Sequence, residues 1–182
     1  GAVGYLKITS RAVGSAYASE IHVRGGLIGE IKPAALEIGT VVELHDLFYA
    51  TPARLKFLRS EKAESKAIQD IIKRLAIAEP SVNFILRDMS KGGDGRTIFN
   101  FRQQEGDREK SIQGRLAQVL GPNFTENSIF INTERDGIRL LGYAALPTYS
   151  RGAAVQQFFF VNGRPIKDKL LIGALRGAYS DL

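Results

Sequence analysis

The sequence predicts an α+β protein built from two parts, and three features support this prediction. In the first part, apolar and polar residues alternate as they do in half-buried β-strands. In the middle of the chain, isoleucines and a leucine repeat at helical spacing. Near the C-terminal end, a continuous apolar run stops at an Asn-Gly turn, and a basic helix follows. Strands and helices in this order are typical of layers packed around a hydrophobic core.

The composition is that of a folded, moderately basic protein. Of the 182 residues, 44% are hydrophobic and 24% are charged, and 25 Lys and Arg against 19 Asp and Glu give a net charge of +6. This charge suits a polyanionic partner without requiring one. The lack of cysteine excludes disulfides, thiolate zinc sites and a cysteine nucleophile. Apolar runs too short for a membrane span and a start unlike a signal peptide lead us to expect a cytoplasmic protein without membrane contact.

Four strands are predicted in the first third of the chain: residues 5–11, 17–24, 27–32 and 40–48. The first two alternate apolar and polar side chains, and Gly25-Gly26 supplies a turn into the third. Gly39 leads into the fourth, which is rich in β-forming residues. With another turn at residues 11–16, the strands are expected to form an antiparallel meander.

A short helix is predicted at residues 51–58. Thr51 is a favourable N-cap, and Pro52 fits the first helical position. Glu61 and Glu64 then mark the start of a longer helix, where carboxylates interact favourably with the helix dipole. We therefore interpret this pair as structural rather than catalytic.

The longer helix ends before Pro80 and is recognised from its apolar face. That face consists of Ile68, Ile71, Ile72 and Leu75. Asp70 and Arg74 lie four residues apart, the spacing of a stabilising ion pair on a helix. Residues 82–88 are predicted to return as a strand.

Residues 89–97 are rich in glycine and charge. A phosphate-binding loop would need Gly-Lys-Ser or Gly-Lys-Thr after its glycines, and this loop has neither, so we predict a flexible hairpin turn. We place the domain boundary at its start, with one domain at residues 1–88 and the other at residues 89–182.

The second domain is predicted to run helix, hairpin, buried strand, helix. Its first helix spans about residues 110–120, and residues 128–146 form two strands joined at Asp136-Gly137, a dipeptide favoured in tight hairpins. The apolar run at residues 156–163 is expected to be a central strand buried on both faces. The last helix begins near Asp168 and is expected to direct four apolar side chains inward: Leu171, Ala174, Leu175 and Ala178.

Four cations follow the apolar run: Arg164, Lys167, Lys169 and Arg176. Lys169 and Arg176 are seven residues apart, so they project from nearly the same side of the helix. Cations on a rigid element bind phosphates by charge, independently of base sequence and with strong salt dependence. The alternative is an ordinary solvated helix face. Because no aromatic residues are interleaved with the cations, backbone contact is favoured over base stacking.

The chain has no motif for a self-contained active site. His22 and His45 lie in strand patterns without metal-ligand spacing, and neither Gly-x-Ser-x-Gly nor His-Glu-x-x-His occurs. We therefore predict no catalytic residue and no metal site in this segment.

Two segments are specific enough to compare with a known family. Residues 39–64, GTVVELHDLFYATPARLKFLRSEKAE, closely resemble the segment of MutL-type DNA mismatch repair proteins in which a Gly-Thr strand leads to a Thr-Pro-Ala-Arg helix. Residues 158–171, FFFVNGRPIKDKLL, resemble the Val-Asn-Gly-Arg strand and basic helix of the same family. YLKITSR matches too, and the order and spacing agree, so the resemblance spans essentially the whole chain.

The resemblance implies that residues 1–88 are the C-terminal part of a GHKL-type ATPase sandwich and residues 89–182 the N-terminal part of an S5-like transducer domain. In this family, ATP binding drives dimerisation, and the ATP-bound form couples mismatch recognition by MutS to downstream nuclease and helicase steps. We therefore expect the full-length protein to use ATP and Mg²⁺, to form a homodimer and to bind double-stranded DNA nonspecifically. The family's catalytic Glu, magnesium-binding Asn and lid precede this chain, so we expect the segment alone to bind no ATP and to be inactive.

Site residues follow from the resemblance position by position. Gly39 and Thr40 match the Gly-Thr motif beside the nucleotide base, where a Thr hydroxyl can bond to an adenine edge or its water. Arg164, Lys167 and Lys169 match the basic positions after Asn-Gly, and Lys169 is the strongest candidate for a DNA contact. A further cation, Arg176, is included because it lies on the same helix face.

The chain departs from the family at two positions, Ala50 in place of Asn and Leu55 in place of a second Arg.

Two other interpretations remain open. One is a fragment resembling a type II topoisomerase B-subunit, which shares the ATPase and transducer folds; the combination of Thr-Pro-Ala-Arg with Val-Asn-Gly-Arg argues against it. The other is a non-enzymatic module whose basic face docks an acidic protein.

Overall fold

The computed structural model describes residues 2–149 and 156–180, and the chain forms two compact units, Gly1–Glu64 and Ser65–Leu182. The division falls inside helix α1 (Glu61–Ala78), earlier in the chain than the predicted domain boundary after residue 88. A compact unit and a family domain need not coincide, so the predicted domain boundary stays a prediction.

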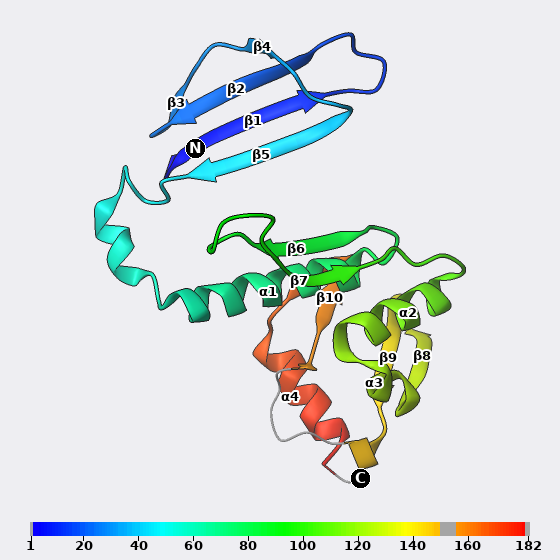
Figure 1. Ribbon diagram of the computed structural model, residues 1–182. Coiled ribbons are helices and arrows are strands. Elements are labelled where there is room, and N and C mark those ends of the chain that lie inside the picture. The colour runs from blue at the N-terminus through cyan, green and yellow to red at the C-terminus, as the bar shows by residue number, and fades with distance from the viewer. Residues whose placement is uncertain (1, 150–155, 181–182) are drawn as a thin grey trace. The chain divides into compact units, whose positions relative to one another are not determined.

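The first unit contains an antiparallel sheet of five strands (Figure 1). They are β1 (Tyr5–Arg11), β2 (Ala18–Arg24), β3 (Leu27–Ile28), β4 (Lys32–Ala34) and β5 (Gly39–His45). The turn at Gly25-Gly26 has φ angles of 54° and 91°, which glycine adopts without steric cost. The run predicted as one strand at residues 27–32 is divided between β3 and β4, which pair with different parts of β2.

The strand order is β3-β2-β1-β5, with β4 also paired to β2, so the predicted simple meander is wrong. Because β2 occupies one edge of β1, β5 adds to the other edge, with Val42 opposite Ile8 and Leu44 opposite Leu6. Sequence alternation determines which side chains share a face, but it does not determine which strands become neighbours.

The two faces of this sheet differ in chemistry. One face carries apolar side chains from its three longest strands: Leu6, Ile8, Ile21, Val23, Val42 and Leu44. The other carries a row of ionic contacts, in which Lys7 Nζ lies 3.1 Å from a Glu43 carboxylate oxygen and 3.8 Å from one of Glu20. The sheet therefore offers one apolar and one charged surface.

The Thr-Pro-Ala-Arg segment forms a 3₁₀ helix, η1 (Pro52–Phe57), where a short helix was predicted. Thr51 occupies the predicted N-cap position, but its side chain makes no capping hydrogen bond, and its buried hydroxyl has no partner among the described residues. Pro52 still begins the helix, as its fixed φ angle favours.

Helix α1 confirms the predicted longer helix. Its buried residues are Ala76 and Ile77, near the C-terminal end. The predicted apolar face is more exposed, with exposed fractions of 50%, 57% and 41% at Ile68, Ile71 and Leu75. Helical periodicity therefore identified the helix correctly but not the side chains that this chain buries.

The described part of the second unit combines hairpins and helices. The helices besides α1 are α2 (Arg108–Leu120), α3 (Pro122–Glu126), η2 (Pro147–Tyr149) and α4 (Lys169–Ala178). The paired strands are β6 (Phe84–Asp88) with β7 (Arg96–Phe101), β8 (Ser128–Arg135) with β9 (Ile138–Ala145), and β10 (Phe159–Val161) with β11 (Arg164–Ile166).

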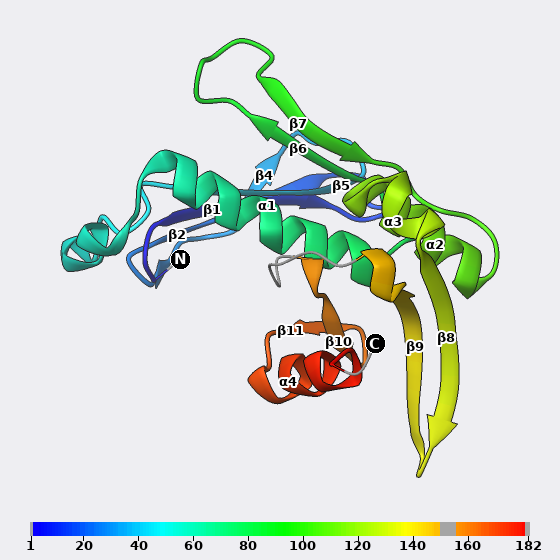
Figure 2. The same ribbon diagram turned by 90° about the horizontal axis from the view of Figure 1, so that it is seen from below.

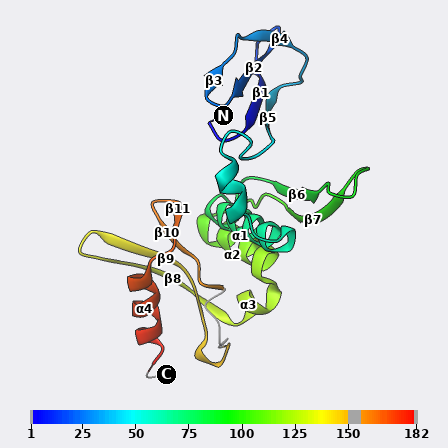
Figure 3. The same cartoon turned by 90° about the vertical axis from the view of Figure 1, so that its left-hand side faces the viewer.

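The hydrophobic core of the second unit lies where α1, α2 and α3 meet (Figure 3), with Ile77, Leu116 and Phe124 buried together. The predicted helix at residues 110–120 is thus confirmed as α2. The β8–β9 hairpin is also confirmed, and its turn residues Asp136 and Gly137 have φ angles of 52° and 76°. Figure 2 shows this hairpin running away from α2 and α3.

The prediction of a central strand at residues 156–163 is wrong. Strand β10 has three residues and pairs with β11 in a two-stranded sheet, because Asn162-Gly163 reverses the chain with φ angles of 48° and 78°. Phe158 and Phe160 pack against the core, whereas Val161 is exposed. The apolar run therefore reflects core contacts on one side of a short hairpin, not a strand buried on both faces.

Helix α4 begins as predicted, because the Asp168 carboxylate accepts a hydrogen bond from the Leu171 main-chain nitrogen at 2.9 Å. Leu171 and Leu175 are half-buried. The prediction is wrong for two other inward positions, since Ala174 and Ala178 are exposed. With small side chains at those positions, the contact face of α4 is narrower than expected.

Candidate functional site

The four cations predicted to bind DNA lie in the β11–α4 segment of the second unit. Arg164 is the first residue of β11, and Lys167 lies in the connection to α4. Lys169 is the first residue of α4, and Arg176 lies in its last turn. All four residues are exposed. A hairpin and a capped helix therefore determine where the chain presents its cations.

Lys167 has a carboxylate partner. Its Nζ donates to Asp70 Oδ2 at 3.0 Å, and the same oxygen accepts a hydrogen bond from Arg74 Nε at 3.0 Å. Burial tends to raise the pKa of Asp70, but hydrogen bonds from Arg74 and Lys167 outweigh this effect and lower the pKa below its ordinary value. Lys167 is therefore less available to a phosphate than an unpaired lysine.

The other three cations, Arg164, Lys169 and Arg176, form no ion pair with any residue in the described ranges. Lys169 lies at the N-terminal end of α4, where the helix dipole adds to its positive potential. The capping carboxylate of Asp168, the residue before Lys169, reduces the positive potential at this end of the helix. Exposed, unpaired cations on a hairpin and an adjoining helix can hold phosphate oxygens by charge.

The predicted nucleotide contact, Gly39 and Thr40, lies at the start of β5 on an edge of the sheet. Gly39 has a φ angle of 140°, which favours glycine even though a Cβ there would meet no atom within 4 Å. Thr40 Oγ1 lies 2.8 Å from Ser10 Oγ on β1, and the Ser10 hydroxyl donates to the Gly39 carbonyl oxygen at 3.4 Å.

Ser10 and Thr40 are exposed on the apolar face of the sheet, next to Ile8 and Val42. Hydroxyls that can both donate and accept suit the polar edge of a nucleotide base, and the apolar face suits its ring. These residues therefore fit a contact with the base.

Two residues of these sites were not assigned a functional role from the sequence. Ser10 is an ordinary polar residue at the end of a strand, and only the register that places it opposite Thr40 gives it a role. Asp70 was predicted to pair with Arg74, but Lys167 lies 97 residues away along the chain. No local pattern indicates either tertiary contact.

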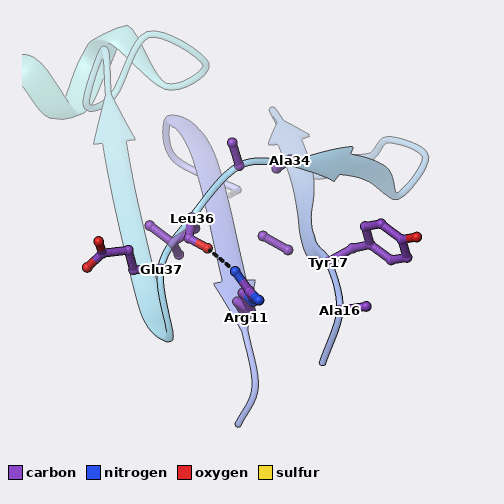
Figure 4. A pocket seen from close by; sticks show the side chains of 8 residues that line it. Arg11, Ala16, Tyr17, Ala34, Leu36 and Glu37 are labelled. Carbon is purple, nitrogen blue, oxygen red and sulfur yellow. Dashed lines mark hydrogen bonds between the residues drawn. The ribbon is translucent and has the colours of Figure 1, made fainter. Parts of the chain in front are cut away.

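An open cavity of about 460 Å³ lies at the same end of the sheet but on its charged face (Figure 4). Arg11, Tyr17 and Glu37 line it together with several alanines. Arg11 Nε donates to the Ser15 carbonyl oxygen at 3.1 Å, and Arg11 Nη1 donates to the Leu36 carbonyl oxygen at 3.4 Å. Neither predicted nucleotide-contact residue lines this cavity, so the two features are separate.

The His22 ring stacks with Tyr5 at a centroid distance of 5.6 Å, and the His45 ring lies tilted to Tyr5 at 5.8 Å. His22 contacts Glu20, and His45 contacts Glu43. Among residues 2–149 and 156–180, no group of three or more His, Asp or Glu side chains is placed to hold a metal ion. In the same ranges, no helix has both the length and the apolar character needed to cross a membrane.

Comparison with known proteins identifies the family. The whole chain aligns with the DNA mismatch repair protein MutL of Rhizobium rhizogenes at 49% identity over 181 residues, and with MutL of Rhizobium meliloti at 48%. The chain belongs to the MutL family of DNA mismatch repair proteins. A family model described as the C-terminal domain of DNA mismatch repair protein matches residues 116–182, which include the basic segment. The chain spans about 28% of the length of these two MutL relatives.

Solved structures confirm the predicted fold class of this MutL-family chain. The Aquifex aeolicus MutL ATPase domain complexed with ADP matches with a TM-score of 0.74 and 27% identity, over 97% of this chain and 64% of that chain. The N-terminal domain of a DNA repair protein matches with a TM-score of 0.81 over 99% of this chain and 56% of its own; at 17% identity it supports the fold alone. The fold is α+β, part of a GHKL-type ATPase followed by part of an S5-like transducer domain.

Proposed function

We propose that this MutL-family chain contributes nonspecific DNA binding to a mismatch repair protein, through phosphate contacts made by the cations of β11 and α4. The observation that supports this most directly is the exposure of Arg164, Lys169 and Arg176 without ion pairs in the described part of the chain. Lys167 adds a fourth cation, shared with Asp70. Contacts of this kind position a protein on the DNA backbone and do not read base sequence.

The full-length protein, in this proposal, is an ATP-switched homodimer of the bacterial cytoplasm that couples mismatch recognition by MutS to downstream nuclease or helicase steps. The MutL relatives and the similarity to an ADP-bound MutL ATPase domain support it. Thr40, held by Ser10, contacts the nucleotide base beside Gly39. ATP supplies the free energy of the switch, and residues outside this chain hold its phosphates and Mg²⁺.

Charge reversal at Lys169 tests the DNA-binding proposal. The substitution Lys169→Glu in the 182-residue chain should weaken binding to a random-sequence duplex by roughly tenfold at low salt, because a phosphate contact is replaced by repulsion. Fluorescence anisotropy of a labelled duplex at several salt concentrations measures this effect. Lys62→Glu is the matched control, since Lys62 is exposed in the first unit and the net charge changes equally. Equal affinities for these two variants exclude Lys169 from the DNA contact.

Competition separates DNA binding from docking of an acidic protein. Labelled duplex bound to the chain should be displaced by unlabelled duplex and not by an equal charge concentration of an acidic polypeptide such as polyglutamate. Stronger displacement by the polypeptide favours the protein-docking alternative.

A nucleotide assay tests the expectation that the segment alone has no ATPase activity. The 182-residue chain should neither bind ATP at micromolar concentration nor release phosphate from it. ATP turnover by the purified chain contradicts this expectation.

A further inference from the structure

Asp70 of α1 binds two cations through one carboxylate oxygen. Its Oδ2 accepts hydrogen bonds from Arg74 Nε and from Lys167 Nζ, each at 3.0 Å. We call Asp70, Arg74 and Lys167 the Asp70 cluster. All three residues belong to the second unit, and the cluster joins α1 to the basic segment that precedes α4.

The two cations of the Asp70 cluster are held very differently. The Arg74 side chain is 11% exposed, and its guanidinium carbon lies 4.7 Å from the centroid of the Phe158 ring. The Lys167 side chain is 69% exposed, and no second carboxylate of the described chain binds it. Arg74 is therefore fixed by packing as well as charge, whereas Lys167 is restrained mainly by one exposed ion pair.

The Asp70 cluster has two positive charges and one negative charge, so the carboxylate does not need Lys167 for charge balance. The single negative charge of Asp70 is already balanced by Arg74, so Lys167 brings the cluster to a net charge of +1. If Lys167 leaves, the Asp70–Arg74 pair remains, and the partly buried carboxylate keeps a partner. Departure of Lys167 is therefore far less costly than departure of Arg74.

We propose that Lys167 exchanges between Asp70 and a DNA phosphate, so that Asp70 limits the affinity of the basic segment for DNA. This inference rests on the proposed DNA-binding function. A carboxylate and a phosphate bind the same ammonium hydrogens, and the two anions repel each other when both are near Lys167. Lys167 consequently gives a phosphate its full attraction only after it has left Asp70. Asp70 is a positioning residue for Lys167 and does not itself bind DNA.

Binding of a random-sequence duplex to Asp70→Asn tests the proposal. This variant of the 182-residue chain should bind at least threefold more tightly than the matched control Glu126→Gln, which loses the same charge at an exposed position in α3. The slope of log affinity against log salt should be the same for the two variants, because Lys167 contacts one phosphate in each and only the competing carboxylate is lost. Equal affinity for the two variants overturns the proposal.

A double-mutant cycle shows whether the effect acts through Lys167. In a Lys167→Ala background, Asp70→Asn should change affinity no more than Glu126→Gln does. A gain that persists in that background overturns the proposal. Lys169→Glu separates this result from the proposed DNA-binding function. If Lys169→Glu weakens binding more than Lys62→Glu does while the cycle shows no coupling, DNA binding stands and the exchange is wrong.

The unmodified chain offers a measurement that does not depend on folding of a variant. The pKa of the Asp70 carboxyl group, followed by carbon NMR, should rise when a duplex is added, because one of its two cations withdraws. A pKa that stays constant at saturating DNA overturns the proposal.

Discussion

Arg115 Nη2 donates a hydrogen bond to the main-chain carbonyl oxygen of Pro80 at 2.9 Å. It also donates to the carbonyl oxygen of Val82, and the guanidinium lies within 6 Å of the Phe84 and Phe101 ring centroids. The side chain is fully buried, and no carboxylate of the described chain pairs with it. Burial lowers the pKa of Arg115, yet Arg remains a cation at all ordinary pH values. Arg115 thus connects α2 to the segment that follows α1.

Replacement of this cation should destabilise the second unit. The substitution Arg115→Met preserves most of the side-chain volume but leaves the Val82 carbonyl without its hydrogen bond, so the free energy of unfolding should fall by about 1–3 kcal/mol. Urea unfolding followed by circular dichroism measures it, with the exposed Arg102→Met as control. If Arg115→Met is as stable as the original chain, relief from burying an unpaired cation balances the lost hydrogen bonds.

The charged face of the first unit should lose stability in acid. The hydrogen bond from Lys7 lowers the pKa of Glu43 below 4.5, and a hydrogen bond with His22 lowers the pKa of Glu20. A carboxyl group with a lowered folded pKa stabilises the fold above its unfolded pKa, and this contribution disappears as pH falls through the folded pKa. The apparent Tm of the first unit should therefore decline as pH falls below about 4.5.

The same reasoning predicts the behaviour of Lys7→Met. Without the Lys7 hydrogen bond, the pKa of Glu43 should return toward its ordinary value. The apparent Tm of the first unit should then decline less steeply with falling pH than in the original chain. Thermal unfolding between pH 3 and pH 7 measures both slopes, and Lys62→Met serves as an exposed control. If Tm falls with pH at the same rate in Lys7→Met and Lys62→Met, Lys7 does not lower the pKa of Glu43.

Ser10 should support nucleotide binding in the full-length protein. Removal of its hydroxyl by Ser10→Ala frees the Thr40 side chain to rotate, and ATP affinity should fall by about threefold to tenfold, the effect of one neutral hydrogen bond. Ser10→Thr keeps a hydroxyl and should restore much of the affinity. Ser19→Ala is a suitable control, because Ser19 lies opposite Ser10 on the next strand. Unchanged ATP binding by Ser10→Ala removes this residue from the proposed contact.

Local sequence patterns predicted the helices, strands and turns better than they predicted which side chains those elements bury. The alternation at residues 5–11, the helical repeat around Ile68 and the Asp-Gly turn at residue 136 all correspond to observed elements, because they depend on neighbours within a few residues. The burial predicted for residues 156–163 was wrong, since an apolar run has the same appearance in a buried strand and in a short hairpin that packs one side on a core.

The sequence by itself determined the α+β class, the MutL resemblance and the position of the basic segment, because each depends on residue types and spacing along the chain. Tertiary structure decided that β5 lies beside β1, that Ser10 faces Thr40, and that Asp70 binds Lys167. Those contacts join residues far apart in sequence, and strand register and helix packing, not local preference, bring them together. The availability of the Lys167 charge to DNA therefore depends on the Asp70 carboxylate, which lies 97 residues away in sequence and cannot be identified from the residues around Lys167.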